Sequence, residues 1–319
     1  MRAPTFRTSV LAALMGGTLA LSGCTEAADP GDDVDTPTTA STPDTSPADA
    51  GSSAGEPSSS AGAPGSPSPS AAPTAATGDR TVAVYWVGST PRGPRLFREF
   101  RRAPGPDALA GAVDLLTSGE ALDPDYRSLL PAGSVESVVH DRDAGRVVVE
   151  LRDDAWTTPA PGTSRRRARL AVQQLVHTAQ AAVQERVPVV VTLGGVPTTL
   201  LGVDTREGVR QADPLDVLAL VSVTAPEQGS VLEGSFRARG VASAFEATVP
   251  WELRRGSEVV LEGFATAEGW MDRLYPWETD EIDVSGLEPG RYTFVASTGD
   301  PSGGEGPGPT VDTKEVEVR

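Results

Sequence analysis

The sequence predicts an α+β domain followed by an all-β sandwich, with a disordered segment in front of both. Strand and helix patterns are mixed within residues 80–210, which is typical of an α+β domain. From residue 216 to residue 319 only short strand patterns occur, separated by turn residues at spacings typical of a β-sandwich. Residues 24–79 are almost entirely Ala, Ser, Thr, Pro, Gly and Asp, so they contain too few large apolar side chains to fold.

Residues 1–23 have the pattern of a secretory signal peptide. Arg2 and Arg7 precede an apolar stretch that is too short to span a bilayer permanently. The stretch ends in a motif that resembles the lipobox of bacterial lipoproteins, which implies diacylglyceryl transfer to the cysteine thiol and cleavage just before it. The alternative is a plain signal peptide with an incidental cysteine. The motif consists of Leu21, Ser22, Gly23 and Cys24, and Cys24 is the only cysteine of the chain.

The net charge and the disordered segment of residues 24–79, which we expect to act as a tether, indicate where the folded domains are located. The chain has a formal net charge of −17, so it should be repelled by nucleic acid and by anionic headgroups. Its only lysine is Lys314, and this arginine bias indicates a GC-rich genome. We therefore expect a protein anchored by lipid at the extracytoplasmic face of the cell membrane, with the disordered tether holding its domains away from the bilayer.

In the first domain the expected order is two strands, a helix, two strands, a helix and a last strand. Asp107 is expected in the first turn of the first helix, where negative charge is favoured, and Gly119 is expected at its end. Ser164 is a cap for a long amphipathic helix that should reach about Arg186. The strands are expected at Thr81–Val87, Leu96–Arg101, Ser134–His140, Arg146–Leu151 and Val187–Leu193.

In the second domain the helical signals disappear, and runs rich in β-branched residues predict seven short strands. These are Val217–Val223, Ser235–Val241, Ala244–Arg254, Glu258–Ala265, Glu278–Val284, Gly290–Ser297 and Thr313–Val318.

Two sets of motifs resemble known domains. In the first domain they are Val84–Val87, Phe97–Arg102, Ala112–Gly119, Leu129–Ser134 and Gly145–Leu151, which together resemble the GerMN domain of sporulation and spore-germination lipoproteins. In the second domain Val223–Gly229 and Gly240–Ala247 resemble the immunoglobulin-like Gmad2 domain. The resemblance implies a GerMN-like fold, an immunoglobulin-like sandwich and a binding or assembly role in the envelope. A germination role is not implied, because the inferred GC-rich source fits non-sporulating bacteria as well as it fits spore formers.

The residues do not predict a catalytic centre. A nucleophilic hydrolase needs a nucleophile, a base and a group that orients the base. The only histidines are His140, at a strand end, and His177, beside the buried stripe of the long helix. Asp153 and Asp154 are an alternative acid pair, although solvated loop acids are the commoner arrangement. The chain lacks metal-binding and phosphate-loop motifs, so no enzyme activity, metal or cofactor is expected.

Two groups of side chains are candidates for partner binding. Arg165, Arg166 and Arg167 form a basic cluster where positive charge opposes the helix dipole, so the alternatives are a solvated helix end and a site for an acidic partner. Trp270, Tyr275 and Trp277 lie within eight residues of one another, and are either sandwich core or a patch for a partner or glycan.

The sequence therefore favours a non-catalytic envelope protein that binds another envelope component. The expected partner is an envelope protein or a cell-wall polymer, with direct peptidoglycan or glycan recognition as the alternative. An envelope hydrolase would require Asp153 or Asp154 in a deep cleft. A structural spacer would expose no apolar or aromatic patch.

Overall fold

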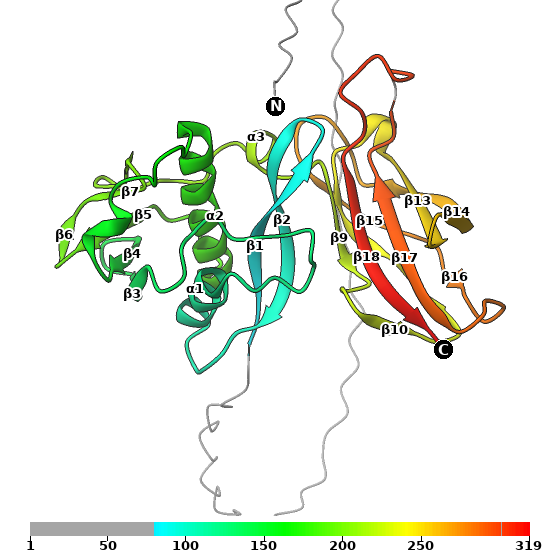
Figure 1. The fold of residues 1–319 in the computed structure, drawn as a ribbon, viewed down its shortest axis with the longest axis horizontal. Helices are drawn as coiled ribbons and strands as arrows, with labels where there is room; N and C mark the ends of the chain where they lie inside the picture. The colour runs from blue at the N-terminus through cyan, green and yellow to red at the C-terminus, as the bar shows by residue number, and fades with distance from the viewer. Residues whose placement is uncertain (1–79, 301) are drawn as a thin grey trace, which may run out of the picture. The chain divides into compact units, whose positions relative to one another are not determined.

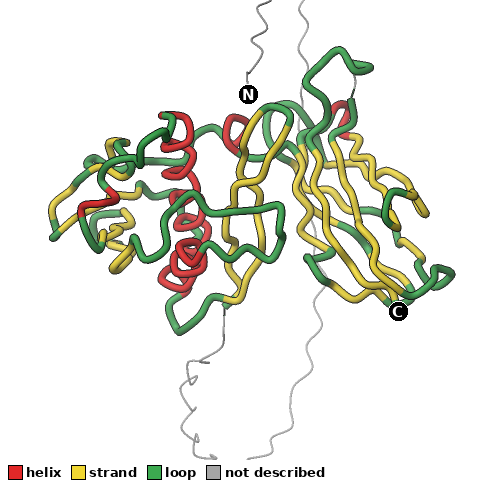
Figure 2. Tube along the Cα trace, viewed as in Figure 1, coloured by secondary structure: helices red, strands yellow, loops and turns green. Residues whose placement is uncertain are grey.

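The computed structural model describes residues 80–300 and 302–319, so the predicted signal peptide, the lipobox with Cys24 and the predicted tether lie outside the described residues. Within the described part, no helix is long and apolar enough to cross a membrane. Two hydrophobic cores are present, one built mainly from residues before 220 and the other from residues after it. Figure 2 shows that the long helices lie in the first domain and that the second consists mainly of strands and the loops between them. The predicted α+β domain followed by an all-β domain is confirmed.

In the first domain the two main helices lie between two layers of strands (Figure 1). Strands β1 and β2 form an antiparallel ribbon on one side. On the other side a four-stranded sheet has the order β3-β4-β5-β6, in which β4 and β5 are parallel. The elements are β1 Thr81–Thr90, β2 Gly93–Arg102, α1 Ala108–Ser118, β3 Val135–Asp141, β4 Arg146–Leu151, a 3₁₀ turn at Asp154–Trp156, α2 Arg165–Val183, β5 Val189–Leu193, β6 Val196–Pro197, β7 Thr199–Leu200 and β8 Val203–Asp204.

Helix α2 begins at its predicted cap, whereas α1 begins directly after Asp107, which caps the helix rather than lying in its first turn. The Asp107 carboxylate accepts hydrogen bonds from the first free backbone N–H groups of α1, and Gly119 ends α1 with a φ of 77°. The Ser164 hydroxyl caps α2 by accepting from the Arg167 N–H at 3.2 Å. Helix α2 ends at Val183 rather than near Arg186, because Gln184 adopts a left-handed conformation with φ 59°.

Helix α2 buries polar as well as apolar side chains, because strand layers lie on both sides of it (Figure 1). Its buried glutamines bond to backbone groups of neighbouring loops. The Gln174 Oε1 atom accepts from the Leu129 N–H at 2.9 Å, and the Gln173 Oε1 atom accepts from the Ala212 N–H at 2.8 Å. These bonds fix the loops around the helix. A helix with a single apolar stripe, as the sequence predicts, would leave these polar positions at the surface.

The second domain is a sandwich whose strands pair in the order β10-β18-β17-β13-β14-β15-β12-β9. The ten-residue strand β14 pairs with β13 along its length and with β15 at its end, so it links the two layers around one core. The strands are β9 Val221–Ala225, β10 Ser230–Leu232, β11 Ser235–Phe236, β12 Arg239–Ala242, β13 Thr248–Arg255, β14 Glu258–Ala267, β15 Tyr275–Glu278, β16 Ile282–Asp283, β17 Gly290–Ser297 and β18 Val311–Val318.

Some predicted strands have different bounds in the structure. The strand expected at Val217–Val223 begins only at Val221, because the Asp213 carboxylate caps a helical turn, α3 (Pro214–Val217), by accepting from the Leu215 N–H. The strand expected at Glu278–Val284 is split between β15 and β16. The one expected from Ala244 begins with a 3₁₀ turn at Phe245–Ala247.

Candidate functional site

The structure separates the three aromatic residues that the sequence groups together. Trp277 is 3% exposed and belongs to the core of the sandwich, which is the core alternative for this residue. The Tyr275 hydroxyl donates to the Asp272 carboxylate at 2.8 Å, and the Arg273 guanidinium lies 4.5 Å above its ring. Trp270 is 37% exposed. Of the three, Trp270 is the one that offers a large apolar surface to a partner.

Trp270 is part of an exposed aromatic patch that consists of Phe245, Trp270 and Met271. The Phe245 and Trp270 rings meet edge to face with centroids 5.1 Å apart. Phe245 is 49% exposed and Met271 is 67% exposed, although both are apolar. The patch borders a cavity of about 410 Å³. The sequence does not mark Phe245 as a candidate for partner binding, because the residue falls within the strand expected at Ala244–Arg254.

Strained backbone holds this aromatic patch in place. Met271 has a φ of 76°, and Glu246 and Ala247, which follow Phe245, have φ values of 52° and 59°. Such conformations disfavour residues other than glycine, and they persist only where the surrounding structure enforces them. The Met271 N–H donates to the Ser243 hydroxyl at 3.1 Å, which ties the two loops together. The exposure of the patch is therefore built into the loops.

The predicted basic cluster lies at the first turns of α2, and the structure extends it. Arg165, Arg166 and Arg167 are exposed. The Arg166 guanidinium donates to the Arg92 carbonyl oxygen at 3.2 Å, which brings α2 next to the β1–β2 turn. Arg95 of β2 lies in the same region. Burial lowers the pKa of Arg95, and the nearby Arg166 lowers it further, while Asp216 opposes the shift.

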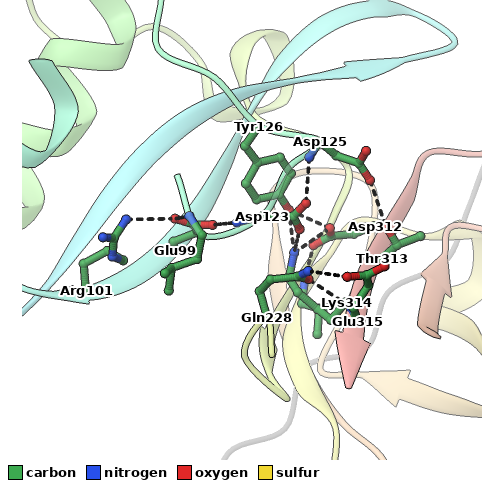
Figure 3. Close-up of polar contacts among 12 residues, drawn as sticks. Glu99, Arg101, Asp123, Asp125, Tyr126, Gln228, Asp312, Thr313, Lys314 and Glu315 are labelled. Carbon is green, nitrogen blue, oxygen red and sulfur yellow. Dashed lines mark hydrogen bonds and ion pairs between the residues drawn. The ribbon is translucent and has the colours of Figure 1, made fainter. Parts of the chain in front are cut away.

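A buried polar network joins the two domains around Lys314 of β18 (Figure 3). The Lys314 Nζ atom lies 2.6 Å from Asp123 Oδ2 and 3.0 Å from Asp312 Oδ1, and it donates to the Tyr126 hydroxyl at 2.8 Å. The Tyr126 hydroxyl in turn donates to Asp312 at 2.6 Å. All four side chains are buried, so the ammonium group of the only lysine links the loop after α1 to the last strand of the sandwich.

The charges of this interdomain network depend on one another. Burial lowers the pKa of Lys314, but the two carboxylates outweigh that effect and raise it, so the ammonium stays charged. Burial raises the pKa of Asp312, against the opposing effect of Lys314. Burial also raises the pKa of Tyr126, and the nearby carboxylates add to the shift, so its hydroxyl remains a donor. Removing any member would leave buried polar groups without partners.

The loop that carries Asp123 and Tyr126 is held from its other side as well. The Glu99 carboxylate of β2 accepts from the Leu122 and Asp123 N–H groups at 3.2 Å and 2.8 Å, as Figure 3 shows in part. Burial raises the pKa of Glu99, and these two hydrogen bonds oppose the shift. The Thr313 hydroxyl also donates to Asp125 at 3.0 Å.

Apolar and backbone contacts continue the junction between the domains. The Ala219 N–H donates to the Leu96 carbonyl oxygen at 2.8 Å, and Arg98 of β2 donates to the Thr224 hydroxyl at 3.2 Å. Leu96 is buried in a small cluster with Leu170 of α2 and with Leu218, beside the start of the second domain. The sequence patterns predict two successive domains and give no sign of this junction.

The residues that the sequence offers as catalytic candidates lie in a turn and in the buried part of a helix. The Asp153 carboxylate accepts from the Ala155 N–H at 2.9 Å and caps the 3₁₀ turn, and Asp154 is exposed at the same turn. His177 is 6% exposed within α2. Burial lowers the pKa of His177 to about 4, and Arg186 adds to the shift. Among the described residues, no group of three or more side chains is arranged to hold a metal ion.

Comparison with known proteins gives matches to both domains. Residues 83–199 match the Germane family model, described as sporulation and spore germination. Residues 220–305 match the Gmad2 model, described as the immunoglobulin-like domain of bacterial spore germination. No curated protein matches the chain.

Two solved structures show limited similarity to the chain, each at 14% identity. The tandem GerMN domains of the sporulation protein GerM from Bacillus subtilis match with a TM-score of 0.32, over 66% of this chain and 63% of that one. An engineered protein matches with a TM-score of 0.25, over 47% of this chain and 36% of that one. The chain thus spans less than two thirds of either structure.

Proposed function

Because the chain joins a Germane domain of the sporulation and spore-germination family to a Gmad2 immunoglobulin-like domain, we propose that it is a non-catalytic assembly module of the bacterial cell envelope. Its partner in this proposal is another envelope protein, which docks on the aromatic patch of Phe245, Trp270 and Met271. The interdomain network around Lys314 holds the GerMN-type domain beside the docking domain, so both domains act together in one assembly.

The aromatic patch is the observation that carries the proposal. The apolar side chains of the patch are 37% to 67% exposed. A partner that covers them would stabilise the complex by about 25 cal/mol for each Å² of apolar surface removed from water. The three side chains are held out by loops with positive φ at non-glycine residues, and relaxing these loops would relieve strain. A patch that is both exposed and strained is typical of a recognition surface.

Membrane attachment is the second part of the proposal. The lipobox-like motif ending in Cys24 supports a diacylglyceryl anchor, and a long Pro- and Ser-rich segment between Cys24 and the folded domains supports a tethering role. In the native host, the Cys24→Ala variant should move from the membrane fraction to the soluble fraction or remain unprocessed. Unchanged membrane attachment of a processed Cys24→Ala chain would refute the anchor without affecting the docking proposal.

Site-specific photo-crosslinking tests the docking surface. A photoreactive amino acid at position 270 of the full chain should crosslink to a defined envelope protein in intact cells. The same amino acid at Val259, which is 41% exposed on β14, is the matched control. A Phe245→Ser substitution should reduce the crosslink from position 270, because it removes the ring against which the side chain at position 270 packs.

Two outcomes would redirect the proposal. Equal crosslinking from positions 259 and 270 would show that the patch is not a specific surface. Retention of the full chain on purified cell-wall sacculi, lost in Trp270→Ser, would instead assign the patch to glycan recognition, since tryptophan rings also stack on sugars.

A further inference from the structure

A second surface, distinct from the aromatic patch, gathers arginines around a cavity. The cavity has a volume of about 700 Å³ and lies between the start of β2, the first half of α2 and α3. Arg95, Arg166 and Arg169 border it, together with Asp204 and Asp216. Arg166 and Arg169 lie on one helix, while Arg95 comes from the ribbon, so the guanidinium groups approach the cavity from two elements.

These three arginines have no ion pair within the described part of the chain, although the chain has 44 acidic residues and 27 basic ones. The Asp204 carboxylate is engaged elsewhere, because it pairs with Arg206 at 2.7 Å. Asp216 remains as the acid that offsets Arg95. The three guanidinium groups and two carboxylates that border the cavity give it a formal charge of +1, in a protein whose overall charge is −17.

The cluster costs stability in the free protein. Arg166 lies in the first turn of α2, where the helix dipole disfavours positive charge. Arg95 is half-buried and close to Arg166, so the two guanidinium groups repel each other in a partly desolvated place. A bound anion would relieve both effects at once. The planar guanidinium fork matches phosphate oxygens, and several forks around one cavity suit a tetrahedral group better than a single planar carboxylate.

We propose that the cavity bordered by Arg95, Arg166 and Arg169 binds a ligand that carries phosphate groups. The ligand enters between the ribbon and α2, and its phosphate oxygens accept hydrogen bonds from the three guanidinium groups. The same chemistry would serve a free phosphate compound and a phosphate-bearing wall polymer. This inference does not depend on the aromatic patch, which is formed by loops of the second domain.

Isothermal titration of the full chain in detergent, with inorganic phosphate, pyrophosphate and polyphosphate as probes, tests the proposal. We expect binding that weakens with salt and falls by about tenfold or more in the double variant Arg166→Gln/Arg169→Gln. The double variant Arg102→Gln/Arg142→Gln is the matched control, because it removes the same charge from exposed arginines elsewhere in the first domain. The melting temperature of the Arg166→Gln/Arg169→Gln variant should stay equal to that of the native chain or rise, whereas a structural role for these arginines would lower it.

The probes also separate the two sources of phosphate. Binding of polyphosphate alone, lost in Arg166→Gln/Arg169→Gln, supports a polymer, and binding of inorganic phosphate or pyrophosphate with the same loss supports a small compound. Absence of binding by all three probes, or an equal loss in the control variant, would overturn the proposal. Trp270→Ser should retain phosphate binding, so failure of the docking proposal and failure of this one are distinguishable.

Discussion

His177 is a titratable side chain that is buried inside the first domain. It lies within α2, 6% exposed, with the Tyr85 ring 5.2 Å away. Its Nε2 atom has no hydrogen-bond partner among the described residues. A neutral imidazole tolerates this place far better than an imidazolium, which explains why burial lowers the pKa of His177 to about 4. The residue therefore acts as a neutral packing group rather than as a base.

Acid should destabilise the fold through His177. The unfolded pKa of about 6.5 lies above the folded value, so protonation favours the unfolded chain. The contribution of neutral His177 is complete above pH 6.5 and declines as pH falls toward 4. Between pH 7.5 and pH 4.5 it should decrease by roughly 2–3 kcal/mol. Urea unfolding at both values should show this extra loss in the native chain but not in His177→Leu. Identical pH dependence in the two proteins would contradict the assignment.

At the level of elements, the sequence predicts those helix ends that are fixed by groups within one helical turn. The cap at Ser164 and the ending at Gly119 are confirmed, because a side-chain hydrogen bond and a left-handed glycine act within one helical turn. Asp107 lies at the start of α1, but it caps the helix rather than lying in its first turn. The burial of Gln173 and Gln174 in α2 could not be predicted this way. It depends on loops 37 to 47 residues away in sequence that supply backbone partners.

The packing of β12 against β9 and β15 leaves no room for a side chain at Gly240. A Cβ atom at this position would lie 2.0 Å from the Ser222 carbonyl oxygen and 2.9 Å from the Trp277 ring. Gly240→Ala should therefore lower the free energy of unfolding by roughly 1–3 kcal/mol or more, since backbone rather than a flexible side chain must move. Gly286→Ala is the control, because no atom lies within 4 Å of its Cβ. Thermal unfolding of both variants checks this. A loss of stability in Gly240→Ala no larger than that in Gly286→Ala would show that β9 can move to make room for the Cβ atom.

On the scale of the whole folded part, the junction between the domains brings together residues that lie far apart in the sequence, so no single element predicts it. In β18 the alternate residues Asp312, Lys314, Val316 and Val318 are buried on one side. Read from the sequence alone, this alternation was the available sign that the only lysine lies on a buried face. Its partners could not be predicted, because Asp123 and Tyr126 are nearly two hundred residues away and belong to a loop. Of the aromatic patch only Trp270 was a candidate from the sequence, because Phe245 falls within the strand expected at Ala244–Arg254.

Lys314→Met tests whether this junction holds the two domains together. The variant leaves Asp123 and Asp312 buried without their cation, which should lower stability by roughly 3–5 kcal/mol. If the loss falls on the junction, calorimetry should resolve two transitions where the native chain shows one, because each domain keeps its own core. Backbone amides at the junction, such as those of Val223 and Ala219, should exchange hydrogen faster than those of the domain cores. Arg319→Met, directly after the same strand, is the matched control: Arg319 pairs with Glu317 at 2.9 Å in solvent, so its removal should change neither readout. A single transition in Lys314→Met, with unchanged exchange at the junction, would mean that the apolar contacts around Leu96 suffice to couple the domains.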